Sequence, residues 1–363
     1  MNFADYLTQK LPAVEAEIMR GLPAATLAAA AAPVVAAAPA ASATATTTPS
    51  ERTSADLNTY LYQPLAHFSA GGGKRVRPVL CCLGAEAVGC SAEAALPVAC
   101  AIEDFQSAAL IHDDIADKSE LRRGEKCLYK TLGTGLAINV GDSALVNVVR
   151  RVTVADHLSD QLKVRVIDAL LAMEEHTLEG QALDLGWAQN ERWDVTSKQY
   201  LFMALSKTAY YSAAYPLVLG ALIGGADQKT LDTLKDFGLK VGLAFQLQDD
   251  LLNLVGNAQV QGKDFRSDIT EGKRTLAVVY ALEHLDPAEK TELVSILSAH
   301  TTDTLRLQHA VELMESVNAI KFVRTHALAL VEEAKLVLKN VILTEDARDT
   351  LLSMADFFVN RER

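Results

Sequence analysis

The chain has 363 residues, of which 50% are hydrophobic and 22% charged, and its net charge at pH 7 is −12. This balance is typical of a globular protein rather than a disordered one. The acidic excess argues against a nucleic-acid partner, which needs a basic surface. The five cysteines show no paired metal-ligand spacing, so we expect reduced thiols and a cytoplasmic location.

The first two segments differ sharply in composition. Residues 1–22 predict a short amphipathic helix, in which Asp5 and Lys10 break the apolar run that a signal peptide needs. Residues 23–52 are rich in Ala, Pro, Ser and Thr and almost free of charge. Because prolines interrupt this stretch and alanine is only weakly apolar, we interpret it as a flexible insertion rather than a membrane span.

The remainder, residues 53–363, repeats apolar side chains at three- and four-residue steps, as amphipathic helices do. The stretch from Glu93 to Ser119 is apolar almost to its end, which favours a buried helix. No stretch alternates at period two for long, so a sheet is not supported. We therefore predict an all-α catalytic domain, organised as a single large helical bundle.

Two acidic clusters stand at the ends of apolar runs. Asp113 and Asp117 are four residues apart, so on a helix they project from one face, with Asp114 beside them. Asp249 and Asp250 form the second cluster in QLQDDLLN. Carboxylate oxygens of this kind suit Mg²⁺ together with substrate phosphates. Each cluster alone could be a solvated helix face, but together on facing helices they would make one acidic mouth.

Basic side chains accompany these clusters. GGGKRVRP places a glycine-rich loop and cations just before a helix start, where a phosphate can bind. ELRRG supplies two arginines for bidentate contacts to oxyanions, and SKT sets a lysine inside an apolar helix, where it would be costly without a partner. The pattern describes a site for two anionic groups. Its basic members are Lys74, Arg75, Arg77, Arg122, Arg123, Lys207, Lys263 and Lys273.

These motifs resemble those of the trans-prenyl diphosphate synthases, which make farnesyl, geranylgeranyl and longer polyprenyl diphosphates. GGGKRVRP, HDDIAD with RRG, GQALDL, SKT, FQLQDDLLN and GKDFRSDITEGKRT follow in the family's order between residues 69 and 275. The resemblance implies an isoprenoid synthase-like bundle with a central cavity. It also implies a homodimeric, Mg²⁺-dependent prenyltransferase without a transmembrane segment, whose partners are isopentenyl diphosphate and allylic prenyl diphosphates.

The resemblance also implies a role for each matched residue. About three Mg²⁺ ions would be held by Asp113 and Asp117, with Asp114 in support, and by Asp249 and Asp250. The allylic diphosphate would contact Arg122, Lys207, Lys263 and Lys273. Isopentenyl diphosphate would contact Lys74, Arg77, Gln106 and Arg123. Beside the developing allylic cation would lie Thr208 and Gln246, in a cavity also lined by Gln181 and Asp184.

Three positions need separate interpretation. Asn253 stands where many family members have a third aspartate, and Gln106 stands where many have a histidine. The amide oxygen of Asn253 can still accept or ligate, but it brings no charge, so we expect a weaker hold on the metal there. Glutamine can donate a hydrogen bond similar to that of histidine, so we expect activity to survive the change at position 106. His112 directly precedes the acidic cluster, and we interpret it as a structural histidine bonded to a backbone carbonyl rather than as a catalytic base.

Product length is predicted from the side chains that precede Asp113. Ala108 and Ala109, with Phe105 deeper, would form the floor of the chain-growth cavity, and small residues there leave it open. We predict geranylgeranyl diphosphate as the product, with farnesyl or longer polyprenyl diphosphates as alternatives. Three rival functions are a class I terpene cyclase, a non-catalytic regulatory subunit of a heteromeric synthase, and a purely structural helical protein.

Overall fold

The structure is a computed structural model, and it describes residues 1–24, 50–256 and 265–360. Most of the predicted insertion at residues 23–52, and also Lys263, lie outside the described residues. Within the described ranges the elements are helices, apart from one pair of two-residue strands. The all-α prediction is therefore confirmed.

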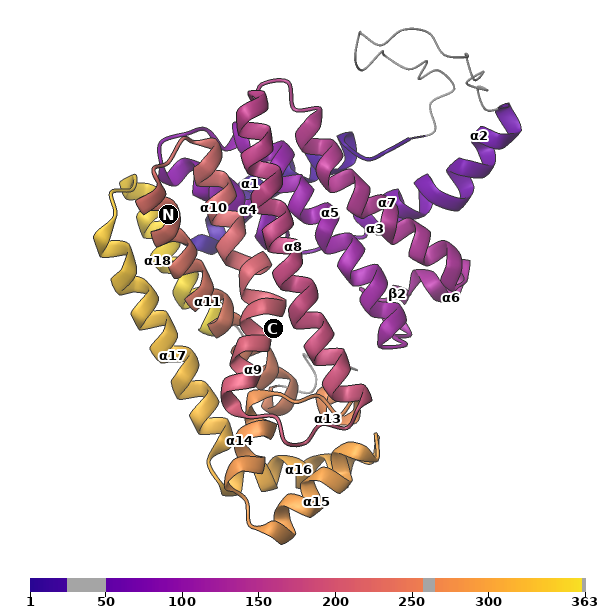
Figure 1. Ribbon diagram of the computed structural model, residues 1–363, viewed down its shortest axis with the longest axis vertical. Coiled ribbons are helices and arrows are strands. Elements are labelled where there is room, and N and C mark those ends of the chain that lie inside the picture. Colours follow the sequence, from indigo (N-terminus) through magenta and orange to yellow (C-terminus); the bar gives the residue numbers. More distant parts are fainter. Residues whose placement is uncertain (25–49, 257–264, 361–363) are drawn as a thin grey trace, which may run out of the picture. The chain divides into compact units, whose positions relative to one another are not determined.

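The chain divides into two compact units. Unit 1 comprises residues 1–11, 75–99 and 157–363, and unit 2 comprises residues 12–74 and 100–156. Two helices belong partly to each unit, α1 (Phe3–Arg20) and α5 (Ala92–Ala116) (Figure 1).

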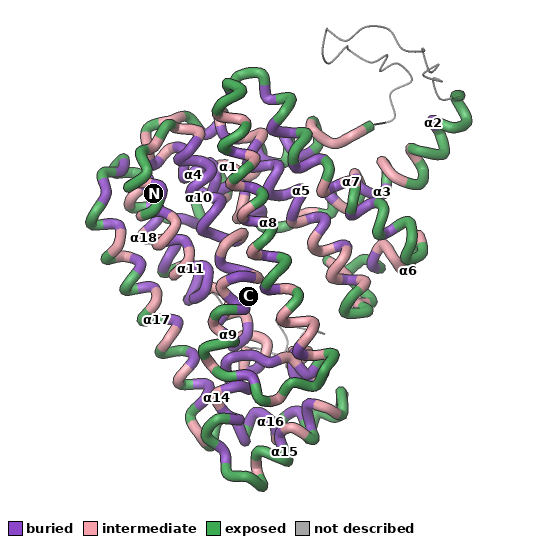
Figure 2. Tube along the Cα trace, viewed as in Figure 1, coloured by how far each residue is buried: buried purple, intermediate pink, exposed green. Residues whose placement is uncertain are grey.

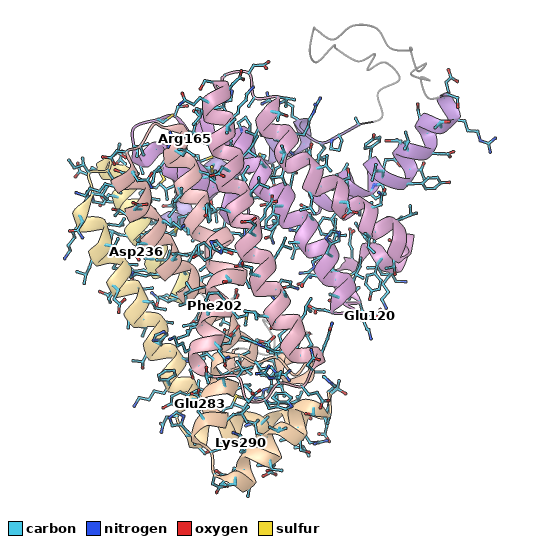
Figure 3. All side chains as sticks on the ribbon, viewed as in Figure 1. Glu120, Arg165, Phe202, Asp236, Glu283 and Lys290 are labelled. Atoms are coloured by element: carbon cyan, nitrogen blue, oxygen red, sulfur yellow. The ribbon has the colours of Figure 1, made fainter. Side chains whose placement is uncertain are left out.

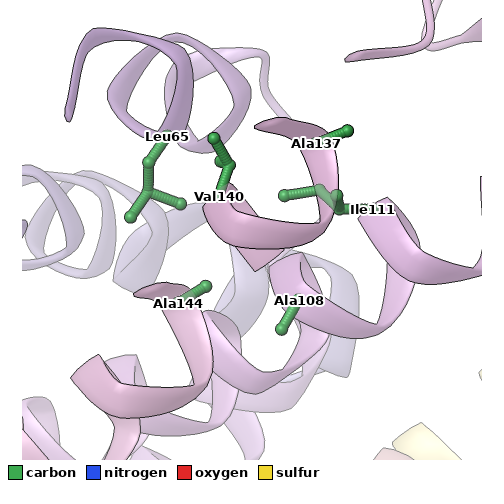
Figure 4. Packing of buried hydrophobic residues seen from close by; sticks show 6 residues of the cluster. All are labelled: Leu65, Ala108, Ile111, Ala137, Val140 and Ala144. Carbon is green, nitrogen blue, oxygen red and sulfur yellow. The ribbon is translucent and has the colours of Figure 1, made fainter. Parts of the chain in front are cut away.

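Unit 2 is built around the second half of α5. Its other elements are α2 (Glu51–Leu57), the π-helix η1 (Asn58–Tyr62), α3 (Gln63–Ala70), β1 (Leu121–Arg122), β2 (Glu125–Lys126), α6 (Leu128–Leu132) and α7 (Thr134–Thr153). Small side chains let α5 and α7 pack closely with α3, as Figure 4 shows. The members of this apolar cluster are Leu65, Ala108, Ile111, Ala137, Val140 and Ala144.

A buried ion pair ties the end of α1 to the rest of unit 2. Arg151 pairs with Asp104, and the side chains of both residues are about 3% exposed. Arg151 also donates to the carbonyl oxygens of Glu17 at 3.1 Å and Ile18 at 2.8 Å, and Asn147 donates to Asp104 at 2.7 Å. The last turn of α1 thus receives a charged donor at two carbonyls, and the Glu17 carbonyl also accepts from the N–H of Gly21 at 3.1 Å.

Unit 1 holds the longest run of helices. Its elements are α4 (Val76–Ala87), α8 (Asp160–Gln189), α9 (Ser197–Ala204), the π-helix η2 (Leu205–Ala214), α10 (Tyr215–Ile223), α11 (Gln228–Val255), α13 (Ser267–Thr270), α14 (Leu276–His284), α15 (Pro287–Ser298), α16 (Thr304–Ser316), α17 (Ala319–Val337), the 3₁₀-helix η4 (Leu338–Asn340) and α18 (Glu345–Asn360).

Helix α10 is the centre of unit 1. It packs against α4, α8 and α11, and its residues from Tyr215 to Leu222 are all buried (Figure 2). A helix that is apolar on every side belongs in the interior, as the sequence YPLVLGALI indicates. By contrast, Phe202 on α9 is 57% exposed and projects from the surface (Figure 3).

Helix starts in unit 1 use the capping residues that the sequence provides. Ser159 caps α8 and Asp227 caps α11, each accepting from a backbone N–H of the first turn. Thr196 opens α9 with a capping box, because its hydroxyl accepts from the N–H of Gln199 while the Gln199 side chain accepts from the N–H of Thr196. The helices that carry the site therefore begin at fixed residues.

Among the described helices, α5 is long and apolar enough to cross a membrane by length and composition alone. Of the 18-residue segment of α5 that is apolar enough, 67% is buried inside the protein. Such burial is typical of a core helix, and it agrees with the predicted buried helix between Glu93 and Ser119.

Candidate active site

The first acidic cluster lies at the C-terminal end of α5, in unit 2. Asp113 is partly buried and Asp117 is exposed, and the N–H of Asp117 donates to the carbonyl of Asp113 at 2.8 Å as the helix ends. Asp114 differs from both, because only 2% of it is exposed. The helix end therefore presents two accessible carboxylates beside a third that is held inside.

The partner of the buried carboxylate is Arg122. Its guanidinium donates to Asp114 Oδ1 from Nε at 3.0 Å and from Nη2 at 2.5 Å. Burial acts against the charge on Arg122, but Asp114 and Asp113 outweigh it and raise the pKa of Arg122. An arginine predicted to bind diphosphate is thus already oriented by the acidic cluster.

A hairpin of two-residue strands carries Arg122. Leu121 pairs with Lys126, and the turn residues Arg123 and Gly124 have φ values of 54° and 85°. Positive φ at both central residues is the requirement of the two-residue hairpin turn that matches strand twist. These strands could not be predicted from the sequence, because two residues are too few to show an alternating pattern.

The remaining predicted residues of unit 2 spread along the same helix and its neighbours. Lys74 and Arg123 are exposed, and the guanidinium of Arg123 lies 5.9 Å from the ring centre of Phe68. Gln106 is partly buried on α5. His112 Nε2 lies 3.3 Å from the carbonyl oxygen of Ile138, as expected for a structural histidine.

The three predicted floor residues are not equally placed. Ala108 is fully buried in the apolar cluster with Leu65 and Val140, and Phe105 is 3% exposed. Ala109, the next residue on α5, is only partly buried. A larger side chain at position 108 therefore has to displace packed neighbours, whereas one at position 109 has more room.

The second acidic cluster lines a cavity of about 270 Å³ in unit 1. The cavity is bordered by α8, α9, η2 and α11 and by the turn that precedes α14. Seven predicted site residues line it together: Asp184, Lys207, Thr208, Gln246, Asp249, Asp250 and Lys273. The predicted meeting of this cluster with the one on α5 remains a prediction.

Asp250 lines the cavity, and two hydrogen bonds hold its carboxylate. Tyr200 donates its hydroxyl to Asp250 Oδ2, and Gln246 Nε2 donates to Oδ1 at 2.7 Å. Burial, reinforced by the nearby charge of Asp268, raises the pKa of Asp250. Thr208 completes the chain by donating its hydroxyl to Gln246 Oε1 at 2.7 Å.

Close approach of α8 to η2 brings Lys207 to its partner. A Cβ at Gly180 would lie 2.1 Å from the backbone nitrogen of Lys207, so only glycine allows this packing. One turn further along α8, Asp184 accepts from Lys207 Nζ in an ion pair whose side chains are 14% and 28% exposed. Burial alone would raise the pKa of Asp184, but Lys207, with Lys273 and Arg274, holds it below its usual value.

Lys207 and Thr208 lie in a π-helical stretch, which the sequence did not predict. The π-helix η2 covers Leu205–Ala214, ten residues in all. Such stretches are uncommon and occur mostly at functional sites. A Cβ at Gly242 of α11 would lie 2.7 Å from the Cα of Ala209, so α11 also approaches η2 closely, which lets Gln246 reach Thr208.

A turn after α11 brings Asp268 and Lys273 to the cavity. Lys273 Nζ lies 3.5 Å from Asp268 Oδ1 and 2.7 Å from Glu271 Oε2. Burial raises the pKa of Asp268, which is 9% exposed. Burial opposes the charge of Lys273, yet Asp268 and Glu271 raise its pKa above the usual value. The turn therefore contributes a carboxylate and a cation to the same wall.

Arg77, predicted to bind isopentenyl diphosphate, also lies in unit 1, near the start of α4. Its Nη2 donates to Ser212 Oγ at 2.8 Å, and its guanidinium lies 4.2 Å from the ring centre of Tyr211. Both partners belong to η2, so the same π-helical stretch that carries Lys207 also orients Arg77.

Two cavity residues were missed by sequence reasoning, Tyr200 and Arg274. A buried tyrosine in an apolar helix is ordinarily a packing residue, so Tyr200 gave no local signal. Arg274 adjoins Lys273 in the last motif, and its guanidinium lies 3.7 Å from the Trp193 ring centre. Asp268 was recognised within its motif but given no role.

Magnesium fits the residues that are present. Among the described residues, no three His, Cys, Asp or Glu side chains are gathered as a complete metal site. An incomplete set of carboxylates suits Mg²⁺, which keeps several waters and takes its other ligands from substrate phosphates. Asp249 is a partly buried carboxylate on the cavity wall beside Asp250.

Comparison with known proteins agrees with this architecture. The polyprenyl synthetase family matches residues 58–314. A short chain isoprenyl diphosphate synthase of Methanothermobacter thermautotrophicus is 39% identical over 299 residues, which are 82% of this chain and 89% of that protein. An all-α fold with acidic and basic side chains around a cavity thus defines a prenyltransferase. The chain belongs to the polyprenyl synthetase family.

Solved structures support the same conclusion. The structure of geranylgeranyl pyrophosphate synthetase from Pyrococcus horikoshii aligns with a TM-score of 0.83 at 28% identity, covering 99% of this chain and 98% of that one. A geranylgeranyl pyrophosphate synthase from Corynebacterium glutamicum, complexed with isoprenyl diphosphate and magnesium, aligns with a TM-score of 0.76 at 28% identity over 85% and 91% of the two chains. The predicted family and isoprenoid synthase-like fold are confirmed.

Proposed function

We propose that the enzyme condenses an allylic diphosphate with isopentenyl diphosphate to give an all-trans prenyl diphosphate, geranylgeranyl diphosphate in the first place. The observation that carries the proposal is the cavity of unit 1, where Asp249, Asp250 and Asp268 face Lys207 and Lys273. Acidic groups alone would repel a diphosphate. Together with the lysines and a divalent cation, these carboxylates form a cavity wall that binds a diphosphate.

The chemistry follows from where charge develops. Breaking the allylic C–O bond leaves the diphosphate more negative and the allylic fragment positive. In unit 1, Lys207 and Lys273 stabilise the departing anion. The Thr208 hydroxyl donates a hydrogen bond to Gln246, so the lone pairs of the Thr208 oxygen can stabilise the allylic cation. The isopentenyl double bond then attacks the cation, and a proton leaves to the departing diphosphate.

Magnesium supplies charge neutralisation at the departing diphosphate when it is bound. We propose about three ions, held by Asp113, Asp117 and Asp249. Asp114 and Asp250 are each engaged by a neighbouring donor, Arg122 and Tyr200. They are therefore proposed to position the site rather than to ligate the ions directly.

The product assignment rests on the small side chains of Ala108 and Ala109, and both solved structures above are named geranylgeranyl synthases. Longer products remain the alternative, and a farnesyl product has less support. Both acidic pairs are intact in this chain, so nothing favours a non-catalytic regulatory subunit.

We also propose a homodimer and a cytoplasmic location. An apolar stripe on α8 supports the dimer, because Val164, Leu171 and Leu178 are 68%, 48% and 64% exposed at seven-residue spacing. All five cysteines carry free thiols, which supports a reducing compartment.

The deciding experiment incubates purified protein with Mg²⁺, radiolabelled isopentenyl diphosphate and, in separate reactions, dimethylallyl, geranyl, farnesyl and geranylgeranyl diphosphate. We expect extension of the shorter primers to geranylgeranyl diphosphate and loss of the reaction in EDTA. Failure to extend any primer would contradict the proposal, and a cyclic hydrocarbon would indicate a terpene cyclase instead.

A further inference from the structure

Asn253 ends the acidic run DDLLN on α11 and faces the cavity with Asp249 and Asp250. Its side chain is directed at a neighbouring turn. Nδ2 donates to Ser267 Oγ at 3.0 Å, and Oδ1 accepts from the backbone N–H of Asp268 at 3.2 Å. Both ends of one amide thus contact two successive residues of α13.

The backbone of the same helix end adds two further bonds to this turn. Arg266 donates its N–H to the carbonyl of Asn253 at 2.8 Å and its Nε to the carbonyl of Leu254 at 3.3 Å. Arg266 has a φ of 62°, a left-handed conformation that is costly for a side chain of this size. Since α13 has only four residues, it needs such outside contacts to hold its shape.

The turn delivers a carboxylate that the acidic run lacks. Asp268 is 9% exposed and lines the same cavity as Asp249 and Asp250. Its carboxylate lies 3.5 Å from Lys273, which itself lines the cavity. Counted with Asp249 and Asp250 of the acidic run, Asp268 is therefore a third carboxylate, and it comes from a turn that Asn253 contacts.

We propose that Asn253 is a positioning residue that fixes the turn at residues 266–268, and that Asp268 is the third carboxylate acting on the metal-bound diphosphate. The second half of this proposal rests on the proposed function. Position 253 then needs the correct hydrogen-bonding shape rather than a charge. Aspartate would also suffice there, because its carboxylate accepts from the Asp268 N–H and from the Ser267 hydroxyl, whose hydrogen can rotate.

The first test is hydrogen exchange on the metal-free protein, which needs no substrate. Asn253→Leu and Ser267→Ala should accelerate exchange in residues 266–273 by about tenfold or more, whereas Asn253→Asp should leave it close to wild type. Asn190→Leu is the matched control. Asn190 is an exposed asparagine whose amide donates to a backbone carbonyl at 2.8 Å and which does not line the cavity. Unchanged protection in Asn253→Leu would overturn the positioning role.

The second test is calorimetric binding of Mg²⁺ with inorganic pyrophosphate, together with kcat and KM for the allylic diphosphate. Asp268→Asn should weaken pyrophosphate binding by about tenfold or more and raise KM, without faster exchange in the turn. Asn253→Leu should weaken pyrophosphate binding similarly, whereas Asn253→Asp should keep it close to wild type.

The outcomes separate the two halves of the proposal. Wild-type binding in Asp268→Asn would overturn the role of Asp268. Binding about tenfold tighter than wild type in Asn253→Asp would show that position 253 is itself a metal ligand. If the wild-type protein neither binds pyrophosphate nor condenses substrates, the proposed function and the role of Asp268 fail together, while hydrogen exchange still decides the positioning role.

Discussion

Arg122 holds one oxygen of Asp114 with two N–H groups, at 3.0 and 2.5 Å, while the adjacent Asp113 stays partly exposed. The same division recurs in unit 1, where Tyr200 and Gln246 hold Asp250 beside a partly buried Asp249. In each pair the second carboxylate is buried, and the first is only partly buried. We therefore expect the first residue of each pair to bind the metal ion, and the second to position the side chains around it.

Replacing Asp113 with Ala should reduce turnover by about 10²–10³-fold or more, because a ligand to the developing charge is lost. Stability should change by less than about 0.5 kcal/mol, since the side chain is only partly buried. Condensation assays and urea unfolding on the same preparation measure both effects. Full activity in this variant would contradict the central role of the cluster.

The matched variant is Asp114→Ala, which should lose stability as well as activity. Removing one member of a fully buried ion pair costs about 3–5 kcal/mol. Arg122 is 31% exposed and can turn towards water, so we expect roughly 2 kcal/mol. If Asp113→Ala and Asp114→Ala behave alike in unfolding, the division of roles between the two carboxylates is wrong.

Product length should respond to bulk at the end of α5. Ala109→Phe is expected to shorten the main product at little cost in stability, because position 109 is only partly buried. Ala108→Phe is also expected to shorten it, but with a loss of about 1–3 kcal/mol, because Ala108 is enclosed by Leu65 and Val140. Chromatography of the products and urea unfolding measure the two effects.

A neutral substitution controls for disturbance of the helix itself. Ala116→Ser lies at the exposed end of α5 and should change neither product length nor stability. An unchanged product profile in both phenylalanine variants would remove these alanines from the cavity floor.

Much of this architecture could be predicted, because helical periodicity and ordered motifs are local properties of the sequence. The relations that complete the site are not local. Tyr200 reaches Asp250 across fifty positions, and Asp268 enters the cavity only because Asn253 holds its turn. The π-helical register at Lys207 has no sequence signature, and the β1–β2 hairpin is too short to show one. Sequence thus identified most of the charged groups, with Thr208 and Gln246, but not Tyr200, which donates to Asp250.

Stability should depend on pH through Glu174. Burial raises the pKa of this carboxyl to about 7, against 4.5 for an unperturbed glutamate. Between these values the folded protein keeps a proton that the unfolded chain has lost, so stability is full below about pH 4.5 and falls as the pH rises towards 7. Glu174→Gln keeps the neutral shape and should remove this loss.

The expected gain for Glu174→Gln is about 1 kcal/mol near pH 8, discounted because solvent still reaches the partly buried side chain. Near pH 4 the variant and wild type should unfold at the same urea concentration. Glu175→Gln, an exposed neighbour, serves as the control. If the stability of wild type and of Glu174→Gln depends on pH in the same way, Glu174 is not the group responsible.

The apolar stripe on α8 predicts how two copies of the chain associate. Val164, Leu171 and Leu178 recur at seven-residue spacing, so they lie along one side of the helix and are exposed in the single chain. Leu171→Glu should place a charge in the centre of the interface and convert the dimer to monomers, as measured by light scattering after gel filtration. Leu305→Glu is the control, because Leu305 is 80% exposed on α16, outside the stripe. A wild-type monomer would refute the dimer, and a Leu171→Glu variant that keeps the dimer mass would place the interface elsewhere.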